Sequence, residues 1–255
     1  MCQLLGMNCN VPTDICFSFS GFAQRGGRTD HHSDGWGIGF FEGNGCRLFL
    51  DPEPAVSSPV AELVRSYPIR SMNVIAHIRK ATHGAVCLEN THPFMRELWG
   101  RYWIFAHNGS LKDFAPPLNG QYRPVGGTDS EIAFCSLLEL LRGRFATQPP
   151  PVELLREAIK EWADQIAAHG IFNFMLSNGE VLFAHCSDRL CYVLRKAPFT
   201  TAHLVDEDIA VDFSEVTTSN DRVAVIATLP LTDNEEWISL QPGECAVFRK
   251  GDRWI

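Results

Sequence analysis

The chain of 255 residues is long enough to bury a full core, and its composition, 45% hydrophobic and 20% charged, is that of an ordinary globular protein. The formal charge of −8, without a lysine or arginine cluster, argues against a nucleic-acid partner. No apolar run approaches the roughly eighteen residues of a membrane span. The N-terminus lacks a signal-peptide pattern and the nine cysteines contain no C-x-x-C pair, so we expect a cytoplasmic protein with reduced thiols.

Strand-like segments occupy much of the chain, and two pairs of them flank strong turn signals, Gly43-Asn44-Gly45 and Asn178-Gly179. Strands are predicted at 36–41, 46–50, 73–79, 102–108, 171–177, 181–187, 190–195, 223–229 and within 244–255. Helices are predicted at 13–24 with Thr13 as the cap, after the capping box Thr128-Asp129-Ser130-Glu131, and at 151–170. Hairpins with helices inserted between them, instead of a strict strand–helix alternation, predict a layered α+β fold.

Polar residues stand where three of these elements end or begin. Arg79 closes an apolar strand, where it is suited to bind a carboxylate through two hydrogen bonds, although a lone arginine at a strand end is more often simply exposed. Asn108 and Gly109 follow another strand and offer two adjacent N–H donors, or only a turn. Asp129 begins a helix, where a negative charge is favoured without any ligand.

Cys2 directly follows the initiator methionine. It can be the first residue of a buried strand, because Leu4 and Leu5 follow and free cysteine is often buried. Removal of Met1 would instead leave a thiol and a free α-amine on one residue, which places a nucleophile beside a base. Position alone does not decide between these interpretations.

The four features in this order resemble the class II glutamine amidotransferases, which are N-terminal-nucleophile (Ntn) hydrolases, and most of all their stand-alone YafJ-type members. The motifs are Cys2, Arg-x-x-Thr-His-Gly from Arg79, His-Asn-Gly from His107, and Thr-Asp-x-Glu at a helix start. The segments "HSDGWGIGF" (32–40) and "PLTDNEEW" (230–237) support the likeness, which runs from Cys2 to about Phe248. It implies a four-layer αββα sandwich and a single glutamine amidotransferase type-2 domain over 1–255.

The resemblance also implies roles for individual residues. Cys2, freed by removal of Met1, attacks the side-chain amide of glutamine and forms a γ-glutamyl thioester, with its own α-amine as the base. Asn108 and the Gly109 N–H are expected to hold the oxyanion. Further substrate-binding residues are expected at Arg79 for the α-carboxylate, at Asp129 for the α-ammonium group, and at Thr82 and His83 along the same side.

Two departures from the larger family members concern the leaving group. This chain has His31-His32-Ser33-Asp34 in place of an Arg-Gly-aromatic-Asp segment, and Lys80 where tryptophan is common after the arginine. Because the chain ends without a synthase domain, we expect a free-standing hydrolase of glutamine or another γ-glutamyl amide.

The alternatives are a glutaminase subunit that delivers ammonia to a separate synthase, and a non-catalytic γ-glutamyl or amino-acid binding module. No cofactor is expected. Nor is a metal, because adjacent histidines such as His31 and His32 point to opposite faces of a strand and no tetrahedral ligand spacing occurs.

Overall fold

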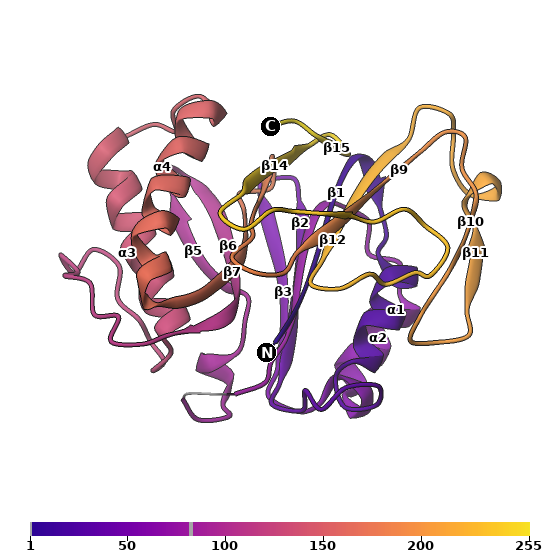
Figure 1. The fold of residues 1–255 in the computed structure, drawn as a ribbon, viewed down its shortest axis with the longest axis horizontal. Helices are drawn as coiled ribbons and strands as arrows, with labels where there is room; N and C mark the ends of the chain where they lie inside the picture. The colour runs from indigo at the N-terminus through magenta and orange to yellow at the C-terminus, as the bar shows by residue number, and fades with distance from the viewer. Residues whose placement is uncertain (1, 82–83) are drawn as a thin grey trace.

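Two β-sheets packed face to face form the centre of the protein. The structure, a computed structural model, describes residues 2–81 and 84–255. The first sheet has seven strands in the order β13-β9-β12-β1-β4-β2-β3, and the second has six in the order β15-β14-β8-β7-β6-β5. Figure 1 shows α1 and α2 on one side of the strands and α3 and α4 on the other.

The strands and helices have the following bounds. The seven-stranded sheet contains β1 (Gln3–Thr13), β2 (Trp36–Glu42), β3 (Gly45–Asp51), β4 (Ser71–Ile78), β9 (Cys191–Lys196), β12 (Arg222–Ala227) and β13 (Ile238–Ser239). The six-stranded sheet contains β5 (Phe94–Leu98), β6 (Arg101–Leu111), β7 (Gly170–Ser177), β8 (Leu182–His185), β14 (Cys245–Arg249) and β15 (Asp252–Arg253). A separate hairpin pairs β10 (Thr201–His203) with β11 (Ala210–Asp212). The α-helices are α1 (Cys16–Gln24), α2 (Pro59–Ser66), α3 (Asp129–Phe145) and α4 (Val152–Ile166).

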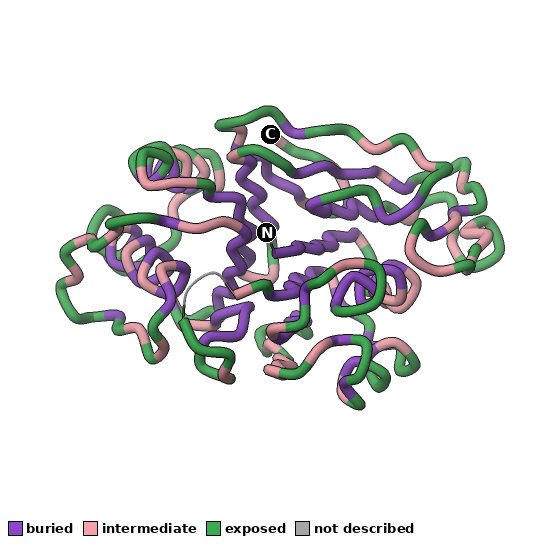
Figure 2. The backbone as a smooth tube through the Cα atoms, turned by 60° about the horizontal axis from the view of Figure 1, so that its bottom comes forward, coloured by how far each residue is buried: buried purple, intermediate pink, exposed green. Residues whose placement is uncertain are grey.

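Three hydrophobic clusters hold these layers together. One joins α1 and α2 to the outer face of the seven-stranded sheet, one lies between the sheets, and one joins the six-stranded sheet to α3 and α4. The buried segments in Figure 2 follow the strands and the inner sides of the helices. The layer order is therefore helices, sheet, sheet, helices, and the predicted αββα sandwich is confirmed.

The predicted hairpins at 36–50 and 171–187 are confirmed, but two details at helix starts differ from prediction. Thr13 is not a helix cap: β1 continues through it, and α1 begins at Cys16, whose N–H donates to Asp14 Oδ1 at 3.1 Å. Thr128 does cap α3, since its hydroxyl accepts from the Glu131 N–H at 3.2 Å. The Glu131 carboxylate, however, accepts from the N–H groups of Val125 and Gly126 and does not return to Thr128.

The structure also describes the state of the cysteines and the length of the helices. All nine cysteines lie within the described residues, and none forms a disulfide. Among the helices described, none is long and apolar enough to cross a membrane.

Buried histidines make the fold sensitive to acid. Burial lowers the pKa of His77 from 6.5 to about 3, and it also lowers the pKa of His92, whose ring centroid lies 4.3 Å from that of His77. Within the described residues, neither ring has a hydrogen-bond partner for its nitrogens. Because the unfolded chain binds a proton at His77 below about pH 6.5 and the folded chain does not, stability is present above that pH and is lost as the pH falls toward 3.

We therefore expect the free energy of unfolding to fall by up to about 1.4 kcal/mol per pH unit for each such histidine. Urea unfolding between pH 7 and pH 4 would show a smaller slope for His77→Phe, which keeps a ring at this position, than for the wild type. The exposed His31→Phe serves as the control. Equal slopes for wild type and His77→Phe would contradict this account of acid sensitivity.

Candidate active site

The candidate residues meet because β1 runs antiparallel to both β4 and β12. The register pairs Gln3 with Ile78 and Leu5 with Ala227, so the start of β1 lies beside the ends of the other two strands. Leu4, Ile75 and Ile226 belong to the cluster between the sheets. By strand alternation, Cys2, Arg79 and Thr228 follow on these same inward faces.

The Cys2 thiol is held by the backbone that follows the Arg79 strand. The Lys80 N–H donates to Cys2 Sγ at 3.3 Å, and Sγ lies 3.5 Å from the Lys80 carbonyl oxygen. Burial raises the pKa of the thiol, the Lys80 contact and the charge of Arg79 lower it, and the charge of Asp129 raises it. The burial effect dominates, so the thiol is neutral at rest, and a base would have to take its proton before the sulfur could attack a substrate.

Asn108 reaches the Cys2 strand from the opposite sheet. On β6, which belongs to the six-stranded sheet, Ile104 and Ala106 face the seven-stranded sheet, and the fully buried Asn108 continues this face. Its amide Nδ2 donates to Thr228 Oγ1 at 3.3 Å, and the same oxygen accepts from the Leu4 N–H at 2.9 Å. Thr228 therefore links the predicted oxyanion donor to β1, the strand that follows Cys2. An amide nitrogen has two hydrogens, so Asn108 keeps one for a ligand.

Gly109 has no room for a side chain. A Cβ built at this position would lie 1.8 Å from the carbonyl oxygen of Ile171 on the neighbouring strand β7. Both Gly109 and Cys2 line a cavity of about 450 Å³, together with Lys80, with Ser110 and Lys112 near the end of β6, and with residues 167–171. The backbone after Asn108 thus approaches the thiol at the wall of one cavity.

Arg79 and Asp129 lie near enough to the Cys2 thiol for both charges to shift its pKa, and neither residue lines the cavity. The Arg79 guanidinium is 3% exposed and donates to the Ala85 carbonyl oxygen at 2.9 Å. Asp129 is the first residue of α3, and its Oδ2 accepts from the Leu111 N–H, at the end of β6, at 2.7 Å. A buried cation and a carboxylate therefore lie near the Cys2 thiol.

Four further residues bear on this site: two that were predicted as substrate-binding residues, one from a segment noted in the sequence, and one that was missed. Thr82 and His83 lie outside the described residues. Asp34, from the segment that departs from the larger family members, accepts from the Ala81 N–H at 2.8 Å and so braces the backbone after Arg79. Thr228 was missed because it follows an apolar strand as an ordinary polar residue, and only the pairing of β12 with β1 brings it to the site.

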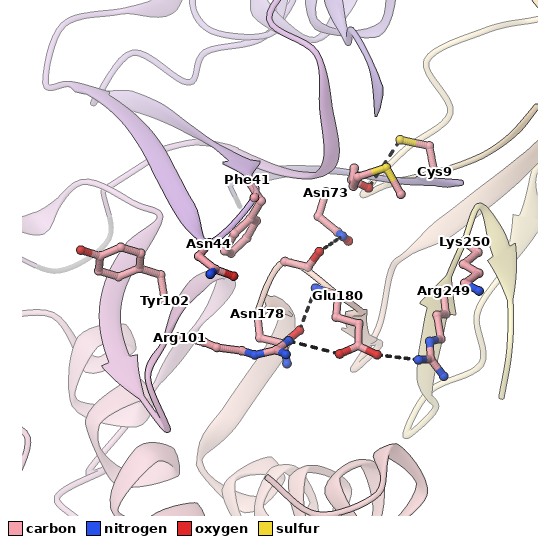
Figure 3. A pocket seen from close by; sticks show the side chains of 13 residues that line it. Cys9, Phe41, Asn44, Asn73, Arg101, Tyr102, Asn178, Glu180, Arg249 and Lys250 are labelled. Carbon is pink, nitrogen blue, oxygen red and sulfur yellow. Dashed lines mark hydrogen bonds and ion pairs between the residues drawn. The ribbon is translucent and has the colours of Figure 1, made fainter. Parts of the chain in front are cut away.

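Another cavity, of about 370 Å³, lies at the opposite end of β1 (Figure 3). It is lined in part by Cys9, which lies seven residues beyond Cys2, or roughly 23 Å along an extended strand. Glu180 pairs there with Arg101 at 3.2 Å and with Arg249 at 2.5 Å. Burial raises the pKa of Cys9 to about 11, so the thiol at this second cavity is neutral near pH 7.

In the part of the chain that the structure describes, no group of three or more His, Cys, Asp or Glu side chains is arranged to hold a metal ion. What the site does contain is a thiol, an amide donor, a cation and a carboxylate. That combination can bind an amino acid and attack a carbonyl group beside it.

Comparison with known proteins shows the family of the chain. The family described as "Glutamine amidotransferases class-II" matches residues 1–255. The chain is 54% identical to "Putative glutamine amidotransferase YafJ" of Escherichia coli (strain K12) over 255 residues, all of both chains. It is 53% identical over 253 residues to a protein of Haemophilus influenzae with the name "Putative glutamine amidotransferase", covering 99% of this chain and 86% of that one.

Two solved structures with similar folds are also named as glutamine amidotransferases. A "predicted glutamine amidotransferase" from Pseudomonas aeruginosa superposes with a TM-score of 0.80 at 50% identity over 99% of both chains. The glutamine phosphoribosylpyrophosphate amidotransferase of B. subtilis superposes with a TM-score of 0.61 at 14% identity, covering 99% of this chain and 48% of that one, which shows a shared fold alone. The chain belongs to the class II glutamine amidotransferases, the family that its sequence motifs resemble.

Proposed function

We propose that residues 1–255 form one glutamine amidotransferase type-2 domain that hydrolyses the γ-glutamyl amide bond of glutamine or of a related γ-glutamyl compound. The observation that carries the proposal is the joint placement of Cys2 and Gly109 on one cavity wall, with Asn108 tied to the Cys2 strand through Thr228. An oxyanion-binding group beside a thiol is the arrangement that acyl transfer requires.

Before the reaction can take place, Met1 has to be removed, which frees the α-amine of Cys2. This amine has an ordinary pKa of about 7.7–8.0, close to the pH at which it would work as a base. It takes the thiol proton while sulfur attacks the γ-carbonyl carbon. The raised pKa of the buried thiol makes such a base necessary.

Attack places a negative charge on the carbonyl oxygen, which Asn108 Nδ2 and the Gly109 N–H would hold. The tetrahedral intermediate then collapses: the C–N bond breaks, the leaving nitrogen takes the proton from the α-amine, and a γ-glutamyl thioester remains on Cys2. Water attacks this thioester, the C–S bond breaks, and glutamate and the free thiol are released.

Arg79 would bind the α-carboxylate of the γ-glutamyl group and Asp129 its α-ammonium group, with Thr82 and His83 along the same side. We expect Asp129→Asn to raise the KM for glutamine about tenfold or more with a smaller effect on kcat, because the amide keeps an acceptor for the Leu111 N–H and loses the charge. Glutamate release over a range of glutamine concentrations measures this.

The control for Asp129→Asn is Asp164→Asn, which removes an equal charge from an exposed ion pair with Lys160 on α4. An unchanged KM in Asp129→Asn would contradict the role of Asp129. A separate synthase that receives ammonia would use the same first half-reaction. Steady glutamate release by the chain on its own therefore favours the hydrolase over the subunit.

A further inference from the structure

The cavity beside Cys2 is not lined by the groups expected to bind the α-amino acid end of the substrate. Its lining includes Cys2 and Gly109 and continues to residues 167–171, between α4 and β7, but it does not include Arg79 or Asp129. If Arg79 and Asp129 bind one end of a γ-glutamyl compound and sulfur attacks its γ-carbonyl group, the cavity faces the nitrogen that leaves. Its walls therefore select the leaving amine.

Two lysines stand on these walls. Lys80 follows Arg79, and its backbone contacts Cys2 Sγ. Lys112 lies across from it at the end of β6, where its N–H donates to the His169 carbonyl oxygen at 2.8 Å and its own carbonyl oxygen lies 3.0 Å from His169 Nδ1. Both backbones are thus fixed while both ammonium groups stay on long, adaptable side chains.

The residues that line this cavity carry a net positive charge, whereas the whole chain carries a net negative charge. The chain has 30 acidic and 22 basic residues, yet the cavity lining contains two lysines and no aspartate or glutamate. In the part of the chain that the structure describes, the lysine that forms an ion pair is Lys160, with Asp164, and neither Lys80 nor Lys112 has a carboxylate partner. Two exposed lysines without a carboxylate partner, on the walls of a cavity that Cys2 also lines, favour an anionic ligand.

We propose that the preferred substrate is a γ-glutamyl amide whose leaving amine carries a negative charge, as in a γ-glutamyl amino acid or peptide, with Lys80 and Lys112 binding the anionic group. This inference rests on the proposed hydrolase function and specifies its substrate class. The bonds break as they do for glutamine. When the tetrahedral intermediate collapses, the C–N bond breaks, the leaving amine takes the proton from the Cys2 α-amine, and the anionic group keeps its charge. The small and apolar walls at Ala167, Ala168 and Ile171 suit a compact amine.

The test compares two substrates that differ in one charge, γ-glutamylglycine and γ-glutamylglycinamide. We expect the wild type to prefer the anionic amide in kcat/KM by tenfold or more, and Lys80→Gln and Lys112→Gln each to reduce that preference about tenfold. The preference should also weaken as salt rises from 0.02 to 0.5 M, because exposed charges are screened. Lys196→Gln, at the exposed end of β9, removes the same charge away from the cavity and serves as the control.

A third substrate, γ-glutamyl-aminomethylphosphonate, distinguishes a carboxylate from a phosphate-like group as the anion that the lysines bind. Hydrolysis of both glycine-based amides at equal rates, or a preference that survives the loss of both lysines, would overturn this inference and leave the hydrolase function intact. Failure to hydrolyse any γ-glutamyl amide, glutamine included, would instead overturn the proposed function and this inference with it.

Discussion

Replacing Cys2 by alanine is expected to lower glutamate release from glutamine by at least about 10⁴-fold, because loss of a covalent nucleophile removes the entire acyl-transfer route. The thiol is 9% exposed and is held by the Lys80 backbone, so the smaller side chain leaves the strand pairing in place. Release of glutamate followed over hours, with thermal unfolding as the check on folding, measures the effect.

The matched control for the Cys2→Ala variant is Cys46→Ala in the hairpin of β2 and β3. Burial raises the pKa of Cys46 to about 12, so that thiol stays neutral and unreactive, and its loss should leave the rate within about twofold. A folded Cys2→Ala protein with wild-type activity would show that another group carries out the chemistry.

Asn108→Ala is expected to lower kcat by about 10²–10³-fold, which corresponds to the roughly 3–4 kcal/mol that one oxyanion donor supplies. The amide is fully buried, and its Oδ1 has no hydrogen-bond partner among residues 2–81 and 84–255. An unpartnered buried acceptor is costly in a structural role alone, which is a further reason to assign this side chain to a ligand or to the freed α-amine.

Because Asn108→Ala leaves a gap between the sheets, Asn108→Asp provides a second variant of nearly the same shape that lacks the N–H donors. Thr228→Ser and Thr228→Val test the positioning role of Thr228. Serine keeps the oxygen that accepts from Leu4 and Asn108, and valine removes it. We expect kcat to fall for valine and to be restored for serine. A change in KM alone for folded Asn108→Asp would contradict the oxyanion assignment.

The parts of this account that could be predicted from sequence are those that local patterns encode. Alternation and turn residues predicted both hairpins, and the capping residue Thr128 placed Asp129 at the start of α3. The order of the motifs predicted the family and hence the sandwich. Asn108 and Arg79 could be named because each stands at the end of an apolar strand, and Cys2 because it directly follows the initiator methionine.

The features that were missed depend on contacts between distant segments. Thr228 meets Leu4 across 224 residues of chain, and no local pattern marks that pairing. α1 starts at Cys16 because β1 continues to Thr13, which pairs with Ser71 beyond a register shift. Helix α2 was not predicted, although Ser58 caps it and Pro59 begins it, because it has only eight residues. The cationic cavity likewise forms only when the end of β6 and residues 167–171 are folded beside Cys2.

The most direct test of the central claim is the intact mass of the protein before and after incubation with the glutamine mimic 6-diazo-5-oxo-norleucine. We expect the untreated mass to lack Met1 and the treated protein to gain one inhibitor equivalent that maps to Cys2. If Met1 is gone and nothing adds, the γ-glutamyl site is contradicted and a non-catalytic binding module explains the fold better. If the protein hydrolyses γ-glutamyl amides while Met1 is fully retained, the α-amine of Cys2 is not the base.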